Sequence, residues 1–260
     1  MERFEGRRAL VTGAASGIGA ATALRLAREG ALVTGMDLAG SGGGPWDKVE
    51  AVASSARFIT GDVSKEADVE RVMAETGPVD IVVNAAGVAS GGAVHDYPVE
   101  EWDRVLDINL KGTFIVCKHA LRGMLEKGGG SIVNIASIEG IEGTEGGSGY
   151  NASKGGVVLL TKNMAIDYGR KGIRVNCVCP GLVDTPMTRS IFDVDGMREH
   201  WRSFEQAHAL GRAARPEEIA AAICFLSSDD ASFVSGSAMV VDGGLTAGHR
   251  FGFAEMMGLG

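Results

Sequence analysis

The sequence predicts an α/β fold in which a doubly wound, parallel, seven-stranded sheet forms a single domain. Short apolar runs alternate with longer segments of helical periodicity along the 260 residues, which is typical of parallel sheets with crossover helices. The apolar runs are continuous, as expected of strands that are covered on both faces. A glycine-rich turn separates the first strand from the first helix, where such folds place a ligand.

The N-terminal half supplies four strands and the helices between them. The first helix begins inside the glycine-rich turn, and Ala20, Leu24 and Ala27 lie on its apolar face. Glycines over 39–44 interrupt the pattern after the second strand and predict a turn. We expect strands over 9–11, 31–36, 57–60 and 79–83, and helices over 17–29, 45–54 and 65–76.

The C-terminal half contains two long helices and the last three strands. The helix over 99–127 ends at three consecutive glycines, which are poor helix formers. The second long helix spans 149–170, and a looser segment spans 182–211. Strands are expected over 131–136, 173–178 and 238–241, a further helix over 216–227, and a tail over 249–260.

The composition is that of an ordinary globular protein, with 45% hydrophobic and 22% charged residues. The net charge of −8 argues against a general nucleic-acid binder. No apolar run reaches the roughly 18 residues of a membrane span, and the first residues lack a signal peptide, so we expect a cytoplasmic protein. The cysteines suit neither a zinc site nor a disulfide framework, and we expect reduced, buried thiols at Cys117, Cys177, Cys179 and Cys224.

The turn after the first strand predicts a site for a pyrophosphate. Its glycines allow the backbone to approach an anion closely, and the free N–H groups and the dipole of the following helix favour negative charge. Glycines alone would be weak evidence for a dinucleotide site. The position of this turn between a strand and a helix makes the prediction much more specific. The residues expected to contact the cofactor here are Gly13, Ser16, Gly17, Ile18 and Gly19.

Asp37 predicts which dinucleotide binds. It ends the second strand, 18 residues after Gly19, where a carboxylate can accept hydrogen bonds from the adenosine ribose diol and repels the 2′-phosphate of NADP. Leu38 and Ala39 follow, and Ser16 is not basic either, so the sequence favours NAD. The alternative is that Asp37 is a solvated turn residue.

Small and polar residues follow the third and fourth strands. Asp62 and Val63 are placed to bracket an adenine ring. Asn84, Ala85 and Gly87 end the fourth strand with the small residues that a flat ligand requires. Each group alone also fits an ordinary turn, but together with the first turn they extend the predicted cofactor site along the strand ends.

Tyr150 and Lys154 are the candidates for the chemistry. They lie four residues apart at the start of a helix and share one face, although such a pair outside this context would more often be a surface pair. A lysine ammonium and a nicotinamide cation both favour the phenolate, so Tyr150 is a candidate general acid–base for a carbinol. Ser137 is placed to hold the substrate oxygen. Asn109, inside a helix, predicts a water-holding kink or a buried amide partner.

In these residues the sequence resembles the shorter branch of the short-chain dehydrogenase/reductase family, whose members have a Rossmann fold. The resemblance covers about residues 5–245. It includes the closing segment 241–244 and the Asn-x-Ala-Gly element at 84–87. The other matching residues are Thr12, Gly13, Gly17 and Gly19, then Asn109, Ser137, Tyr150 and Lys154, and finally Pro180, Gly181 and Thr185.

The resemblance implies an oxidoreductase that transfers a hydride between NAD and an alcohol or ketone without a metal. Tyr150 would exchange the proton and Ser137 would orient the substrate. Lys154 would hold the nicotinamide ribose and lower the pKa of Tyr150, and Asn109 would anchor a water. The family also implies a homotetramer formed through the two long helices. It further implies cofactor contacts from Pro180, Gly181, Val183 and Thr185, of which Thr185 would contact the nicotinamide carboxamide.

Substrate choice is expected to depend on three stretches, at 88–97, 138–149 and 182–210. The third is predicted to be a mobile lid whose apolar side chains suit a hydrophobic or cyclic secondary alcohol, unless they pack the lid against the body. Glu139 begins a series of three glutamates expected to form a solvated rim. The apolar tail is expected to dock on a neighbouring subunit.

Other functions remain compatible with this scaffold. One is an NADP-dependent reductase of 3-ketoacyl thioesters, against which Asp37 argues. Another is a non-enzymatic dinucleotide-binding redox sensor, against which the set of Ser137, Tyr150 and Lys154 argues. A sugar-nucleotide epimerase would require a second substrate domain, for which the chain is short.

Overall fold

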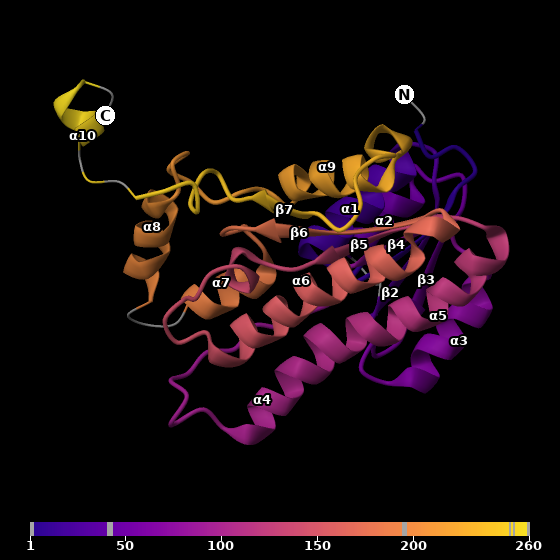
Figure 1. Cartoon of the computed structure of the whole chain (residues 1–260), viewed down its shortest axis with the longest axis horizontal. Coiled ribbons are helices and arrows are strands. Elements are labelled where there is room, and N and C mark those ends of the chain that lie inside the picture. The colour runs from indigo at the N-terminus through magenta and orange to yellow at the C-terminus, as the bar shows by residue number, and fades with distance from the viewer. Residues whose placement is uncertain (1–2, 41–43, 194–196, 250, 252, 259–260) are drawn as a thin grey trace.

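The computed structural model of the chain describes residues 3–40, 44–193, 197–249, 251 and 253–258. A seven-stranded sheet lies between two layers of helices, and a short helix at the C-terminal end stands apart from them (Figure 1). Parts of the predicted turn over 39–44, of the lid and of the tail fall outside the described residues.

All seven strands pair in parallel, in the order β3-β2-β1-β4-β5-β6-β7. The order reverses between β1 and β4, which is where doubly wound sheets open a crevice for a ligand. The predicted doubly wound, seven-stranded sheet is therefore confirmed. The strands are β1 (Arg8–Thr12), β2 (Leu32–Asp37), β3 (Ala56–Thr60), β4 (Ile81–Asn84), β5 (Gly130–Ile135), β6 (Ile173–Pro180) and β7 (Ala238–Val241).

The helices divide between the two faces of the sheet (Figure 1). One face carries α1 (Gly17–Arg28), α2 (Trp46–Glu50) and α9 (Pro216–Ser227). The other carries α3 (Glu66–Thr76), α4 (Val99–Leu106), α5 (Gly112–Lys127) and α6 (Ser148–Tyr168). The segment predicted as a lid contains α7 (Pro186–Phe192) and α8 (Arg198–Ala207), and the tail contains α10 (Phe253–Met256).

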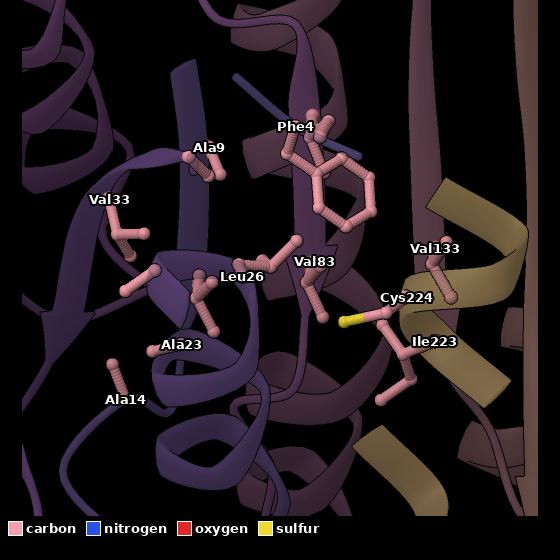
Figure 2. Packing of buried hydrophobic residues seen from close by; sticks show 14 of the residues in the cluster. Phe4, Ala9, Ala14, Ala23, Leu26, Val33, Val83, Val133, Ile223 and Cys224 are labelled. Carbon is pink, nitrogen blue, oxygen red and sulfur yellow. The ribbon is translucent and has the colours of Figure 1, made fainter. Parts of the chain in front are cut away.

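Two hydrophobic cores hold the helices to the sheet. Successive strand residues face opposite sides, so Val82 joins the core under α3 and α5, whereas Val83 joins the core under α1 and α9. In the second of these cores Leu26 from α1 and Ile223 from α9 meet beside Phe4 (Figure 2). All three side chains are fully buried, and each contributes about 1.5–3 kcal/mol relative to exposure.

The helix predicted over 99–127 is present, with a π-helical turn at its centre. This turn, Asp107–Lys111, separates α4 from α5. The side chain of Asn109 is turned inward within this turn and is 1% exposed. Such turns are rare and often mark functional sites, because they redirect a side chain without ending the helix. The short helix expected over 45–54 was too long, since α2 ends at Glu50.

The four cysteines are all free and buried, as the sequence predicts. Among the helices of the described residues, none is long and apolar enough to cross a bilayer.

Candidate active site

A cavity of about 620 Å³ opens at the carboxyl ends of the strands, where the strand order reverses. Segments that follow six of the seven strands line it, together with the first two turns of α6 and Ile108. The structure thus brings together nearly all the residues predicted to bind the cofactor. Those that line the cavity are Gly13, Ser16, Gly17, Ile18, Gly19, Asp37, Asp62, Val63, Ala85, Gly87, Tyr150, Lys154, Pro180, Gly181, Val183 and Thr185.

The glycine-rich turn is packed too closely for side chains. A Cβ atom on Gly19 would lie 2.1 Å from the backbone oxygen of Gly13. Helix α1 begins directly behind the turn, and its N-cap residue Ser16 makes no side-chain hydrogen bond to the helix. The first N–H groups of α1 therefore lack a side-chain cap at the cavity wall, which is the arrangement that binds a phosphate.

Asp37 lies at the cavity wall between this turn and the end of β2. The Ala15 N–H donates to its Oδ2 atom, and the Ala39 N–H donates to its Oδ1 atom, each at 3.0 Å. These bonds fix the carboxylate and leave lone pairs for further donors. Among the described residues that line the cavity, Lys154 is the single cation, and it lies beside Tyr150 rather than beside Asp37.

Asp62 and Val63 follow β3 and line the same end of the cavity. The Oδ1 atom of Asp62 accepts from the backbone and the hydroxyl of Ser64, at 2.8 and 2.7 Å. Val63 packs against Gly112 at the start of α5, where any side chain would collide with it. This wall is rigid and partly apolar, which suits the flat face of an adenine ring.

Two predicted residues do not line the cavity. Asn84 points into the interior, where its Nδ2 atom donates to Asn134 Oδ1 at 2.9 Å and contacts Cys117 Sγ at 3.2 Å. Asn109 binds the segment after β4, since Val88 N–H donates to Oδ1 at 2.8 Å and Nδ2 donates to Val88 O at 2.9 Å. It also donates to Ser153 Oγ at 3.1 Å, so the predicted buried amide partner is present.

The chemistry-bearing residues Ser137, Tyr150 and Lys154 all line the cavity. Lys154 is 5% exposed, and its Nζ atom donates to the carbonyl of Ile135 at 2.8 Å and lies 5.5 Å from the centre of the Tyr150 ring. Ser137 caps a short turn after β5, and its Oγ atom accepts from the Glu139 N–H at 3.1 Å. That bond uses a lone pair of the Ser137 oxygen and not its proton, so the hydroxyl can still act as a donor within the cavity.

The protein's own groups favour the neutral forms of both residues. Burial raises the pKa of the Tyr150 phenol above its usual value, the carboxylate of Glu139 raises it further, and a hydrogen bond with Ser137 lowers it. Burial lowers the pKa of Lys154 to about 8. The implied lowering of the Tyr150 pKa is therefore opposed by burial and Glu139, and the positive charge of a bound, oxidised nicotinamide would act in the required direction.

Glu139 differs from the solvated rim predicted for it. Glu142 and Glu145 are exposed, but Glu139 is half-buried, and burial raises its pKa while Lys154 lowers it. In the amide orientation that satisfies its neighbours, Asn151 donates to Glu139 Oε2 at 2.6 Å. Glu139 thus binds the first turn of α6, beside Tyr150.

The predicted lid adds two residues, Met187 and Thr188, to the cavity wall. Other apolar residues of this segment pack on one another, as Phe192 does on Trp201 with a ring separation of 5.4 Å. Met187 therefore lines the cavity, whereas Phe192 and Trp201 pack on each other within the segment. Thr185 caps α7 by accepting from the Thr188 N–H.

Sequence reasoning did not predict ten residues of the wall. Eight of them adjoin a predicted residue, or lie two positions away, along the same strand-end segment, and Thr188 lies three positions after Thr185. Ile108 is different, because it lies inside a helix rather than after a strand and lines the cavity from the π-helical turn, beside Asn109. The residues are Leu38, Ala39, Gly61, Ala86, Val88, Ile108, Ile135, Ala136, Met187 and Thr188.

A second group of ionisable side chains, Glu66, Glu70 and His119, has metal-ligand character but lies away from the cavity wall. The Oε1 atom of Glu66 is 2.6 Å from Lys118 Nζ and 2.9 Å from His119 Nε2. An ammonium on the same oxygen opposes a metal cation. We interpret the group as an ion-pair cluster between α3 and α5.

Comparison with known proteins gives matches over almost the whole chain. The family described as Enoyl-(Acyl carrier protein) reductase matches residues 13–246. A cis-4-hydroxycyclohexanecarboxylate dehydrogenase of Sinomonas cyclohexanicum is 44% identical, over 95% of this chain and 99% of that protein. A meso-2,3-butanediol dehydrogenase of Serratia marcescens is 42% identical, over 94% and 96%. The crystal structure of a levodione reductase has a TM-score of 0.89 at 36% identity, over 95% of this chain and 100% of the other.

Proposed function

The chain belongs to the short-chain dehydrogenase/reductase family, and from this premise we propose that it is an NAD-dependent dehydrogenase that interconverts a secondary alcohol and its ketone. Like the two dehydrogenases named above, it is an oxidoreductase that acts on CH–OH groups. The observation that carries the proposal is the meeting of Ser137, Tyr150 and Lys154 at one end of a dinucleotide-sized cavity whose other end holds Asp37.

A hydrophobic or cyclic substrate fits the wall of the cavity best. Val88, Ile108 and Met187 line it and supply no charge. One relative acts on a ring-bearing hydroxy acid and another on a short diol, according to their names. We propose a neutral secondary alcohol, cyclic or bulky, as the substrate of this chain.

The residues present fit a nicotinamide dinucleotide. The uncapped start of α1 and the closely packed glycines suit the pyrophosphate, and Asp37 suits the diol of the adenosine ribose. The segment Pro180–Gly181, with Val183 and Thr185, lies where it would contact the nicotinamide half. When bound, the cofactor supplies the acceptor of a hydride in oxidation and its donor in reduction.

The protein groups would act on the substrate oxygen and its proton. Ser137 donates a hydrogen bond to the substrate oxygen and holds it beside Tyr150. The Tyr150 phenolate removes the hydroxyl proton as the carbinol carbon loses its hydride, and the phenol returns the proton in reduction. Lys154, fixed by the carbonyl of Ile135, would hold the nicotinamide ribose, and its ammonium form would place positive charge beside the phenolate. Asn109 stays a predicted anchor for a water in the proton path.

The choice of NAD over NADP can be tested directly. We expect reduction of NAD with secondary alcohols, cyclic diols, hydroxysteroids or sugars at about pH 9, where a larger fraction of Tyr150 is ionised than at neutral pH. We expect kcat/KM for NAD to exceed that for NADP by about 100-fold, because the 2′-phosphate would meet the Asp37 carboxylate. Initial rates with both cofactors across this panel measure the ratio.

The matched control is Asp37→Asn, which keeps two polar atoms at this position but removes the charge. This variant should lower the ratio of kcat/KM for NAD to kcat/KM for NADP, chiefly because kcat/KM for NADP rises. A wild-type preference for NADP would contradict the proposal and favour the reductase of ketoacyl thioesters. Tight binding of NAD without turnover of any alcohol would favour the non-enzymatic sensor.

We also propose a cytoplasmic homotetramer. The outer faces of α5 and α6 expose large apolar side chains, of which Leu159 and Ile166 are 68% and 80% exposed. Patches of this kind mark protein–protein interfaces. We expect light scattering to give about 108 kDa, four chains of 27.0 kDa, and Ile166→Glu to lower the mass. Val52→Glu, at an apolar position outside these helices, should leave it unchanged; a monomeric wild type would contradict the proposal.

The tail is a second candidate for a subunit contact. Phe251, Phe253, Met256 and Met257 are all exposed, and α10 stands away from the two helical layers (Figure 1). We propose that these side chains dock on a neighbouring copy. Removal of residues 249–260 with no change in mass or kinetics would exclude this contact.

A further inference from the structure

His208 is a buried histidine that the proposed chemistry does not use. It follows α8 directly and is 2% exposed. Its Nδ1 atom lies 2.7 Å from the carbonyl oxygen of Phe204, one helical turn earlier. Its Nε2 atom accepts a hydrogen bond from the backbone N–H of Leu182 at 3.1 Å.

These two bonds define the form of the ring. The Phe204 carbonyl can only accept and the Leu182 N–H can only donate, so the imidazole is neutral with its proton on Nδ1. Leu182 is itself buried, at 3% exposure. Without an acceptor at Nε2 its N–H would be left unpaired in the interior, which is the costly outcome for a buried donor.

The bond to Leu182 reaches the cavity wall. Pro180, Gly181 and Val183 flank Leu182 and line the cavity at its nicotinamide end, and Thr185 follows them. Gly181 allows the imidazole to approach, since a Cβ atom there would lie 2.7 Å from Nε2. The Gly181 N–H in turn donates to Val241 at the end of β7, at 3.2 Å.

The same bond joins the two ends of the predicted lid. Leu182 begins that segment and His208 lies near its end, so the hydrogen bond between them connects the chain before α7 to the chain after α8. A neighbouring pair of backbone bonds, from Ala214 to Leu182 and from Asp184 to Ala214, both 2.9 Å, reinforces the junction. The position of residues 180–185 in the cavity wall therefore depends on His208, which does not itself line the cavity.

We propose that His208 is a positioning residue for the nicotinamide half of the cofactor, because its imidazole fixes the Leu182 backbone and with it the segment from Pro180 to Thr185. The proposal rests on the proposed function in one respect, namely that this segment contacts the nicotinamide. It predicts that loss of the Nε2 acceptor weakens binding of the nicotinamide half and spares the adenosine half, whose predicted contacts lie at Asp37 and Asp62.

Two variants and two ligands test the proposal. In His208→Gln the side-chain carbonyl can reach the Leu182 N–H, whereas in His208→Asn the side chain is one methylene shorter and can reach only Phe204. The ligands are NADH, and ADP-ribose, which lacks the nicotinamide. Dissociation constants are measured by fluorescence titration for NADH and by calorimetry for ADP-ribose, with thermal unfolding of each variant beside them.

We expect His208→Asn to raise the dissociation constant of NADH about tenfold, the effect of leaving one buried donor unpaired. The dissociation constant of ADP-ribose should not rise. We expect His208→Gln to bind both ligands as the wild type does. Equal weakening of both ligands in His208→Asn, no change in either, or the same loss in both variants would overturn the proposal. A wild type that binds ADP-ribose but not NADH would overturn the proposed function and this inference with it.

Discussion

Replacing Tyr150 with phenylalanine is expected to lower kcat for alcohol oxidation by about 10³-fold, within the range of general acid–base catalysis. The substitution removes one oxygen from the cavity wall and leaves the ring that lies over Lys154. NADH should therefore bind nearly as before. Stopped-flow or steady-state rates, together with a fluorescence titration of NADH, separate the loss of chemistry from a loss of binding.

The pH dependence identifies the phenol as the group that is lost. Burial and Glu139 hold the pKa of Tyr150 above its usual value, and oxidation requires the ionised form, so the wild-type oxidation rate should rise with pH. Ketone reduction requires the protonated phenol and should fall over the same range. The residual activity of the phenylalanine variant should show neither dependence.

Tyr168 provides a matched control at the other end of the same helix. It packs against the hydrophobic core under α5, away from the cavity wall. Tyr168→Phe should keep the wild-type kcat and pH profile. A Tyr150→Phe enzyme that kept more than about a tenth of kcat would show that another group exchanges the proton.

Replacing Gly19 with alanine is expected to weaken cofactor binding by at least about 100-fold, or about 2.7 kcal/mol. The added Cβ atom would lie 2.1 Å from the Gly13 oxygen and 3.1 Å from the Thr12 oxygen. Both are backbone atoms at the junction of β1 and the turn, so they cannot move aside as the end of a flexible side chain can. The turn must distort where the pyrophosphate would bind. Calorimetric titration with NADH and with ADP-ribose measures the loss, which should be shared by both ligands.

Gly169 offers a control substitution in open space. A Cβ atom there meets no atom within 4 Å, and the residue has a right-handed helical backbone that alanine adopts readily. Gly169→Ala should bind the cofactor as the wild type does and unfold at the same temperature or slightly higher. A Gly19→Ala protein with unchanged affinity would show that the turn is free to open, and would remove the close-packing argument.

The parts of the site that could be predicted from the sequence are those encoded within a few adjacent residues. The glycine-rich turn, Asp37 at the end of its strand, and Tyr150 one helical turn before Lys154 are local patterns. Local geometry alone decides that such residues face a strand end or share a helix face. The parallel sheet then brings the strand ends together, and sixteen of the seventeen predicted cofactor residues line one cavity.

Side-chain direction and burial depended on partners that are distant along the chain. Asn84 points away from the cavity because Asn134, beside it on β5, accepts its hydrogen bond in the interior. Glu139 is half-buried, and Asn151 of α6 donates to it. The periodicity of a sequence predicts neither the hydrogen-bond partner of a polar side chain nor how far its neighbours bury it.

The sequence by itself predicted the sheet, its crossover helices and the dinucleotide turn, because each follows from periodicity or spacing over short distances, and the family resemblance implied the roles of the residues for proton and hydride chemistry. Only the tertiary structure decided that Asn109 sits in a π-helical turn, that burial and Glu139 raise the pKa of Tyr150, and that His208 binds the Leu182 backbone. Hydrogen bonds and desolvation depend on which groups meet in space, and residues as far apart as Leu182 and His208 meet only after the chain has folded.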